Sequence, residues 1–265
     1  MNYLTTILAA LFASGVFGIA QERVGVSANR WTNSLGMVFV PVPNTTVAFC
    51  IWETRVVDYE VFVREGHWAR LWPKKPDFRQ ETNHPVVNVS WEDAKGFCEW
   101  LTHKEHASGV LKPNQAYRLP TDHEWSFSVG LPREKGATAQ QRSFEISDYY
   151  PWGKMPKTPE HGHGTAVVNV TPRNVGNYTG KNDGFAFTAP VGSYAPNSVG
   201  IYDLGGNVWE WCIDFADDGR RHILRGGSWF SGAIPSGGRD YTLPDGEIGD
   251  FGFRCVRADA PASLD

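Results

Sequence analysis

The sequence predicts a loop-rich α+β fold, in which a few strands and helices are joined by long ordered loops. The chain has 265 residues, of which 41% are hydrophobic and 20% charged, so it is neither disordered nor embedded in a membrane. It contains 11 Trp, 28 Gly and 17 Pro, and many large rings among many turn residues favour packing around aromatics over a helix bundle. The length allows one large domain or two small ones.

The first half of the chain carries most of the regular structure. Alternating apolar residues predict strands over 36–42 and 47–55, and a helix over 56–65 follows. Ser90 to Asp93 form a capping box, after which apolar residues recur at helical spacing. A second box begins another helix at 121–124. From residue 150 onward no helical period occurs, which predicts short strands and long loops held by something other than a backbone ladder.

The charge pattern excludes one large class of function. The formal net charge is −4 and the isoelectric point is near 6.1, with basic and acidic residues interleaved. A nucleic-acid binder needs a basic patch or stripe, which this sequence lacks.

The N-terminus is typical of a secretion signal. Residues 4–16 are mostly apolar, and small residues stand at 18 and 20, where a signal peptidase inspects the chain. The run is too short to span a bilayer comfortably, although no Lys or Arg precedes it. We therefore expect a signal peptide over 1–20, a linker over 21–33, a domain over 34–258 and a tail over 259–265. The expected location is secreted or periplasmic, with tethering by an uncleaved signal as the alternative.

The four cysteines are far apart and show no metal-type spacing. An exported protein with an even number of cysteines is able to form disulfides. Cys98 falls on the apolar side of a predicted helix, however, where a free thiol packs like a small hydrophobe. Two bridges, one bridge or none are all compatible with Cys50, Cys98, Cys212 and Cys255.

Several oxygen-bearing side chains in the second half are candidate calcium ligands. Asp203, Asn207 and Glu210 lie within one segment, and Asn177, Asn182 and Asp183 cluster upstream. Carboxylate, amide and carbonyl oxygens suit Ca²⁺, which tolerates irregular geometry. By spacing alone the commoner role of such residues is to cap backbone groups at turns.

Motifs along nearly the whole chain resemble the formylglycine-generating-enzyme (sulfatase-modifying factor) family. They occur in the family's order between residues 34 and 257: 84–91 (HPVVNVSW), 117–125 (YRLPTDHEW), 150–153 (YPWG), 202–211 (YDLGGNVWEW), 225–229 (RGGSW) and 252–254 (GFR). The resemblance implies a single α+β domain like that of C-type lectins, with little regular secondary structure.

The resemblance also implies two structural calcium ions that fix loops. One would use the side chains of Asp203 and Glu210 with the carbonyls of Gly206 and Val208. The other site is less well matched, because its loop is shorter here than in the best-studied members. Its implied ligands are the side chains of Asn177 and Asp183 and the carbonyls of Tyr178 and Phe185.

The catalytic pattern of the family is not matched. Formylglycine-generating enzymes carry two cysteines after GGS, in the form GGSxxCxxxxCxRYR, whose thiolates hold Cu(I) for oxygen activation. Here Ser231 stands at the first cysteine position. Counted forward from Ser228, the second position is Ser236; counted back from Arg239, the loop is about five residues short and the position is deleted. A hydroxyl is a poor Cu(I) ligand, so copper is not expected.

Three functions are compatible with this pattern. The first is a non-catalytic, calcium-stabilised binding or accessory module, a pseudoenzyme that keeps the scaffold. The second is an oxidoreductase of different chemistry acting on a peptide or small molecule; iron would need a His and carboxylate cluster, and His161 and His163 are the only close His pair. The third is a formylglycine generator with rearranged cysteines, which we rank last because Cys212 and Cys255 stand in core-like motifs.

A functional groove would be lined by residues around the GGS motif. Two arginines could hold a carboxylate or carbonyl of an extended peptide or protein segment, the expected partner, and two tryptophans could supply apolar walls. The alternative is that both tryptophans are core and both arginines pair with nearby acids. The candidate groove residues are Trp209, Arg225, Ser228, Trp229, Ser231 and Arg239.

Overall fold

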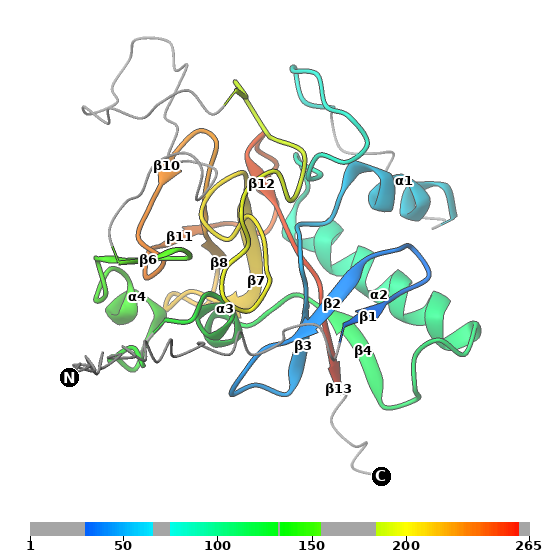
Figure 1. The fold of residues 1–265 in the computed structure, drawn as a ribbon, viewed down its shortest axis with the longest axis horizontal. Helices are drawn as coiled ribbons and strands as arrows, with labels where there is room; N and C mark the ends of the chain where they lie inside the picture. The colour runs from blue at the N-terminus through cyan, green and yellow to red at the C-terminus, as the bar shows by residue number, and fades with distance from the viewer. Residues whose placement is uncertain (1–29, 66–74, 132, 155–183, 260–265) are drawn as a thin grey trace, which may run out of the picture.

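The computed structural model describes residues 30–65, 75–131, 133–154 and 184–259. Its strands form a five-stranded sheet, a four-stranded sheet and two small hairpins (Figure 1). In the described part of the chain, no helix is long and apolar enough to cross a membrane. The α+β class predicted from the sequence is confirmed.

The five-stranded sheet has the order β1-β2-β3-β13-β4, and all neighbouring strands in it run antiparallel. The last strand, β13, therefore lies inside the sheet, between β3 and β4 from the first half of the chain (Figure 1). The strands are β1 (Trp31–Thr32), β2 (Val38–Pro41), β3 (Val47–Cys50), β4 (Gln115–Arg118) and β13 (Val256–Asp259).

Two boundaries in this sheet differ from the predictions. The predicted strand over 47–55 ends at Cys50, because the chain bends there toward the first helix. The expected linker over 21–33 is wrong at its C-terminal end, because β1 lies inside it. The Trp31 ring packs on Phe39 and Tyr117 at centroid distances of 5.4 and 6.1 Å, which attaches this segment to the core.

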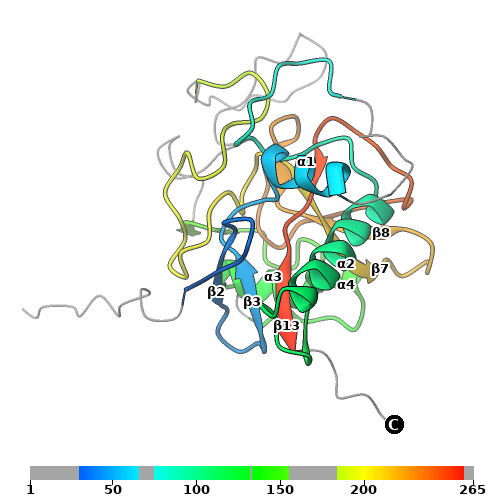
Figure 2. The same ribbon diagram turned by 90° about the vertical axis from the view of Figure 1, so that its right-hand side faces the viewer.

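Helices α1 (Val56–Glu65), α2 (Trp91–Ala107) and α3 (Asp122–Val129) occur where the sequence predicts them, followed by the short α4 (Ala139–Arg142). Both predicted capping boxes are present. Ser90 caps α2 and Thr121 caps α3, each accepting from the third backbone amide of its helix. The helix α2 runs along the five-stranded sheet (Figure 2).

The sheet is buried on both faces, because alternate strand residues enter two apolar clusters. In β2, Phe39 joins the cluster beneath α1 and α2, whereas Val40 joins the one around α3. In β3, Cys50 and Phe49 divide in the same way. Successive strand side chains point to opposite faces, so a run of four buried residues needs apolar partners on both sides.

The second half folds around a four-stranded sheet of order β11-β8-β7-β12, in which β12 runs parallel to β7. The predicted short strands and long loops are confirmed, although β7 reaches seven residues. The strands of this sheet are β7 (Trp209–Phe215), β8 (His222–Arg225), β11 (Arg239–Thr242) and β12 (Phe251–Gly252). One hairpin pairs β5 (Tyr149–Tyr150) and β6 (Gly153–Lys154), and the other pairs β9 (Gly227–Ser228) and β10 (Gly232–Ala233).

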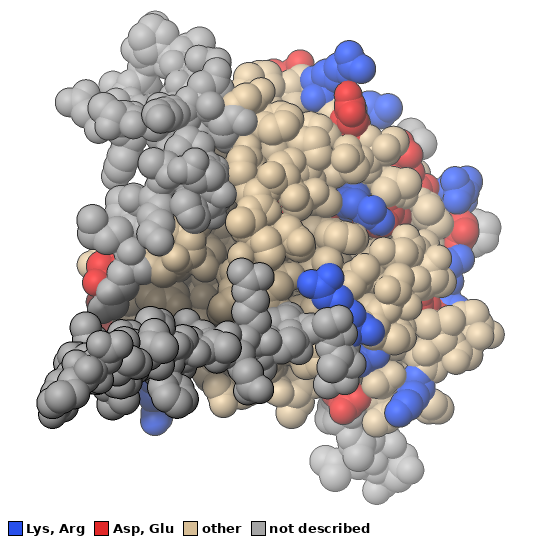
Figure 3. All heavy atoms as spheres, viewed as in Figure 1, with Lys and Arg blue, Asp and Glu red and all other residues tan. Residues whose placement is uncertain are grey.

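The charged side chains on the face shown in Figure 3 mix both signs and gather mainly toward the side of α1 and α2. The centre of this face is largely uncharged. Charges that matter for the fold lie inside the molecule instead, in clusters described below.

Candidate functional site

Ser228 and Ser231 lie at the turn between β9 and β10, and their hydroxyls are tied into it. The buried Ser228 hydroxyl donates to Asp250 Oδ2 at 2.6 Å, and its oxygen accepts from the amides of Phe230 and Ser231 at 3.2 and 3.1 Å. Ser231 Oγ accepts from the Ser228 amide at 2.8 Å and lies 3.2 Å from Ser228 Oγ. Ser228 therefore organises the turn and is not an available nucleophile.

Asp250 is a member of this site that sequence reasoning missed. It is 5% exposed and precedes β12, and its backbone carbonyl accepts from the Trp209 amide at 2.8 Å. Burial raises the pKa of its carboxyl, while the hydrogen bond from Ser228 opposes that rise. No motif spacing signals this role, because the contact joins residues 22 positions apart through the fold.

Trp229 is half-buried and packs against other aromatic rings next to the turn that carries Ser231. Its ring meets Phe78 and Phe187 edge-on, at centroid distances of 5.6 and 5.0 Å, and those two rings stack at 4.4 Å. Trp229 Nε1 donates to the Gly249 carbonyl at 3.1 Å. The neighbouring Phe230 is 58% exposed, so aromatic surface faces solvent next to the two serines.

Trp209, Arg225 and Arg239 do not line a groove, which corrects the expectation for these three residues. Trp209 is 6% exposed and belongs to the core cluster beneath α1 and α2. Arg225 pairs with Asp122 and also donates to the Ser236 carbonyl at 2.8 Å. Both arginine side chains are fully buried, so neither reaches a ligand at the surface.

Asp122 is the centre of the ion cluster that holds these arginines. Arg239 donates to both of its oxygens, at 2.8 and 3.0 Å, and Arg142 donates to Oδ2 at 3.0 Å. Arg239 also pairs with Glu134 at 2.8 and 2.9 Å. Burial opposes ionisation of Asp122, yet Arg225 and Arg239 lower the pKa of its carboxyl well below the usual range. Three guanidiniums against two carboxylates leave this Asp122 cluster a formal charge of +1.

The predicted calcium segment forms a tight turn that leads into β7. Asp203 and Asn207 adopt the left-handed region, with φ of 62° and 63°. Asp203 Oδ2 accepts from the Gly192 amide at 2.7 Å. Asn207 Oδ1 accepts from the Ala189 amide at 3.0 Å, which joins the turn to the preceding loop.

Glu210 faces an arginine and a tryptophan inside the molecule. Arg254 donates to both of its oxygens, at 2.7 and 2.6 Å, and Trp125 Nε1 donates to Oε2 at 3.0 Å. Arg254 also donates to the carbonyls of Cys50 and Tyr202, at 3.2 and 3.0 Å. The family motif that ends in Arg254 thus anchors the turn to the five-stranded sheet.

Glu53 completes this second cluster and was also missed by sequence reasoning. Its side chain is fully buried, and Oε2 accepts from Asn207 Nδ2 at 2.7 Å. Oε1 has no hydrogen-bond partner in the part of the chain that the structure describes. Burial, and then the nearby charge of Asp203, raise the pKa of Glu53 well above its usual value. Three carboxylates against Arg254 leave this Glu53 cluster a formal charge of −2 when all are ionised.

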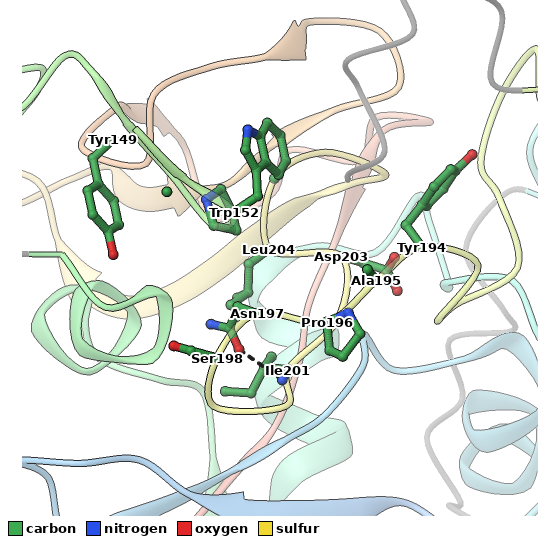
Figure 4. A pocket seen from close by; sticks show the side chains of 13 residues that line it. Tyr149, Trp152, Tyr194, Ala195, Pro196, Asn197, Ser198, Ile201, Asp203 and Leu204 are labelled. Carbon is green, nitrogen blue, oxygen red and sulfur yellow. Dashed lines mark hydrogen bonds between the residues drawn. The ribbon is translucent and has the colours of Figure 1, made fainter. Parts of the chain in front are cut away.

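A cavity of ≈ 370 Å³ opens beside this turn (Figure 4). Asp203 is the only charged residue among the described residues that line it, and Tyr149, Trp152 and Tyr194 supply aromatic walls. A Cβ on Gly205 would lie 2.9 Å from the Trp152 ring, so glycine is required for this close approach. The remaining lining comes from Pro151, Gly153, Ala195, Pro196, Asn197, Ser198, Ile201 and Leu204.

The four cysteines are free thiols, and all are buried. Cys98 lies on the apolar side of α2 as predicted, with its sulfur 3.4 Å from that of Cys255. Burial raises the pKa of Cys50, Cys212 and Cys255. Buried thiols of this kind are inert core groups rather than metal ligands or nucleophiles.

Several predicted site residues lie outside the described residues: Asn177, Tyr178, Asp183, His161 and His163. Phe185, the remaining member of the second predicted calcium site, is described and 39% exposed. Within the described ranges, no three His, Cys, Asp or Glu side chains form a ready metal-holding group. A site at the 203–210 turn would accordingly need backbone carbonyls as well as side chains.

Comparison with known proteins decides the family. The model of the sulfatase-modifying factor enzyme 1-like domain matches residues 11–259. The chain belongs to this family. It is 31% identical over 215 residues to a formylglycine-generating enzyme of Streptomyces coelicolor, covering 73% of this chain and 59% of that protein. It is 30% identical over 211 residues to the inactive C-alpha-formylglycine-generating enzyme 2 of Bos taurus, covering 73% and 57%.

The solved structure of PvdO from Pseudomonas aeruginosa shares the fold. It superposes with a TM-score of 0.62 at 19% identity, over 87% of this chain and 98% of that one. The chain spans less than two thirds of the length of the curated relatives named above. The family of sulfatase-modifying factors thus contains both enzymes and relatives named as inactive, so membership alone does not assign an activity.

Proposed function

We propose that this chain is an exported, calcium-stabilised member of the sulfatase-modifying factor family that binds or assists rather than oxidises. One observation carries the proposal. Ser231 stands where the family's first copper-binding cysteine is expected, and it is hydrogen bonded to Ser228. The Ser228 hydroxyl in turn donates to Asp250. Hydroxyl and carboxylate oxygens are poor ligands for Cu(I). Export is proposed on the apolar run over 4–16 and the small residues that follow it.

The surface beside the serines supports a binding role. Ser231 and Phe230 are exposed, and Trp229 with the stacked pair of Phe78 and Phe187 forms an aromatic floor. We propose that an extended peptide or protein segment lies on this surface, with apolar side chains against the rings and its backbone near the Ser231 hydroxyl. The buried arginines take no part in this contact.

Calcium is proposed at the 203–210 turn because the donor set fits a hard divalent cation. The implied ligands are the side chains of Asp203 and Glu210 and the carbonyls of Gly206 and Val208. With all three carboxylates ionised, the Glu53 cluster would carry an excess of two negative charges, and one buried oxygen of Glu53 has no partner among the described residues; a divalent cation would satisfy both. Bound calcium would neutralise the turn and fix its loops. We also propose a second ion held by Asn177, Asp183 and the carbonyls of Tyr178 and Phe185.

Metal content and oxygen consumption test the proposal together. We expect purified protein to contain calcium without stoichiometric copper or iron, and to consume no oxygen with a cysteine-containing peptide of the sulfatase type. Mass spectrometry should find no loss of mass from the peptide cysteine. Aldehyde formation by the wild-type protein, or stoichiometric copper, would show that the protein is an oxidase.

A further inference from the structure

The cavity of ≈ 370 Å³ has walls whose positions are fixed by the protein itself. It lies between the β5–β6 hairpin and the 194–205 segment, and its volume falls in the range of small-molecule sites (Figure 4). On the hairpin side, the Trp152 ring stacks on Tyr150 at a centroid distance of 5.4 Å and an interplanar angle of 12°. The same ring packs so closely on Gly205 that a Cβ there would lie 2.9 Å from it. The indole is therefore positioned before a ligand arrives, which lowers the entropic cost of binding.

The opposite wall is fixed by Asn197, whose side chain holds a tight loop. Its Oδ1 accepts from the amides of Val199 and Ile201 at 3.1 and 3.0 Å, and its Nδ2 donates to the Ser128 carbonyl at 2.7 Å. These bonds attach the loop to α3 and occupy both acceptor positions of the Asn197 oxygen. Asn197 therefore shapes the wall, while the exposed Ser198 beside it stays available to a ligand.

The polar groups that this cavity offers are mainly hydroxyls. The side-chain hydroxyls of Tyr149 and Ser198 line the cavity and have no hydrogen-bond partner among the described residues. Asp203 is the only charged side chain among the described residues that line it, and it is only 8% exposed, with Oδ2 accepting from the Gly192 amide at 2.7 Å. The cavity thus combines aromatic walls, a buried apolar floor at Ile201 and Leu204, and hydroxyls at its edge.

We propose that this cavity binds a neutral saccharide, with the apolar face of one pyranose ring against the aromatic wall. The C–H groups of a sugar face meet the negative face of an aromatic ring favourably, and the sugar hydroxyls both donate and accept, as those of Tyr149 and Ser198 do. An anionic ligand would lie near Asp203 without a compensating cation in the described lining. A purely apolar ring would cover the two hydroxyls without giving them partners. The site is separate from the aromatic surface at Trp229, and the proposal does not depend on the function proposed above.

Ligand-observed NMR and calorimetry on the full chain test the proposal. The probes are the methyl pyranosides of glucose, galactose and mannose and the disaccharide cellobiose. We expect at least one of them to bind saturably with a one-to-one stoichiometry. Sorbitol is the matched control ligand, because it carries the hydroxyls of glucose on an open chain and presents no rigid apolar face. We expect no saturable binding of sorbitol.

Three variants locate the sugar in the cavity. Trp152→Leu keeps an apolar side chain against Gly205 but removes the ring, and we expect the Kd to rise roughly 2–10-fold. Tyr149→Phe and Ser198→Ala each remove one hydroxyl and should each raise the Kd by a similar factor. Phe215→Ala is the control, because Phe215 is 56% exposed and is not among the residues that line the cavity. It should leave the Kd unchanged.

Several outcomes would overturn the proposal. They are a lack of saturable binding by all four sugars, equal binding of sorbitol, and a Kd that none of the three cavity variants changes. Tighter binding of indole than of any sugar at the same site would show that the cavity takes apolar rings instead. Should Trp152→Leu fail to fold, Ser198→Ala and Tyr149→Phe decide, because each removes a single hydroxyl that makes no hydrogen bond among the described residues.

Discussion

The two buried charge clusters lie on either side of Trp125 but solve the problem of buried charge differently. The Asp122 cluster sets three guanidiniums against two carboxylates, and both oxygens of Asp122 are multiply hydrogen bonded. The Glu53 cluster sets three carboxylates against Arg254 and leaves Oε1 of Glu53 without a partner among the described residues. The charges of the first cluster are thus paired within the protein, whereas the second has more acidic groups than its one arginine can balance.

Trp125 joins the two clusters physically. Its indole N–H donates to Glu210, and Arg225 lies over its ring at 4.4 Å from the centroid. Arg225 and Arg239, which flank the segment that carries Ser228 and Ser231, therefore attach it to Asp122, while the Glu53 cluster holds the neighbouring turn. The comparison teaches that buried arginines close to the position of the family's first copper-binding cysteine can have a purely structural role.

The largest effect is expected from breaking the complete cluster. Asp122→Asn would leave Arg225 and Arg239 buried with only Glu134 as a counter-charge, and we expect a loss of about 3–5 kcal/mol in the free energy of unfolding. Denaturant titration measures it. Asp218→Asn, at an exposed pair with Arg221, is the control and should cause no measurable change. A loss as small as the control's would show that the ion pairs of Asp122 contribute little to stability.

The pH dependence of stability should have opposite signs in the two clusters. The folded-state pKa of Asp122 is lowered, so its contribution is present above the unfolded value of about 4 and is lost as pH falls toward the folded value. The folded-state pKa of Glu53 is raised, so its contribution is present below about 4 and is lost as pH rises through the folded value. In EDTA, Asp122→Asn should flatten the acid limb and Glu53→Gln the limb at higher pH. Identical profiles for both variants would contradict the comparison.

A smaller effect is expected at the bridge. Trp125→Phe keeps an aromatic ring for Arg225 but removes the N–H that donates to Glu210, which retains both bonds from Arg254. We expect a loss of about 1–3 kcal/mol, the range for a hydrogen bond to a charged group plus the reduced ring area. Combining it with Asp122→Asn in a double-mutant cycle measures the coupling. Strict additivity would show that the clusters are energetically independent.

The smallest effect is expected at Arg142, the third guanidinium of the Asp122 cluster, which has one more cation than anions. Arg142→Met keeps the apolar stem, and Asp122 retains Arg225 and Arg239. We expect a change of about 1 kcal/mol or less, because replacing a redundant buried ion by an apolar group of similar volume is often neutral. A loss comparable to that of Asp122→Asn, measured in the same titration, would mean that the third guanidinium is essential.

Much of the fold follows from local sequence. Ser90 and Thr121 begin their helices because a hydroxyl at the N-cap and a carboxylate three residues later satisfy the first amides, whatever lies elsewhere. The helix over Val56–Glu65 has the bounds that the sequence predicted. The family motifs predicted the class of fold and aligned Ser231 with the family's first copper-binding cysteine.

The tertiary structure alone decided which polar residues are buried together. Asp122 meets Arg225 across 103 residues and Arg239 across 117, and Glu53 meets Asn207 across 154. The sequence offered the arginines as groove residues, because spacing along a chain does not show which side chain a distant segment will bring near. Burial removes the water that would solvate a charged group, so its partners must come from the fold, and only the fold shows which residues surround Glu53 and Asp250.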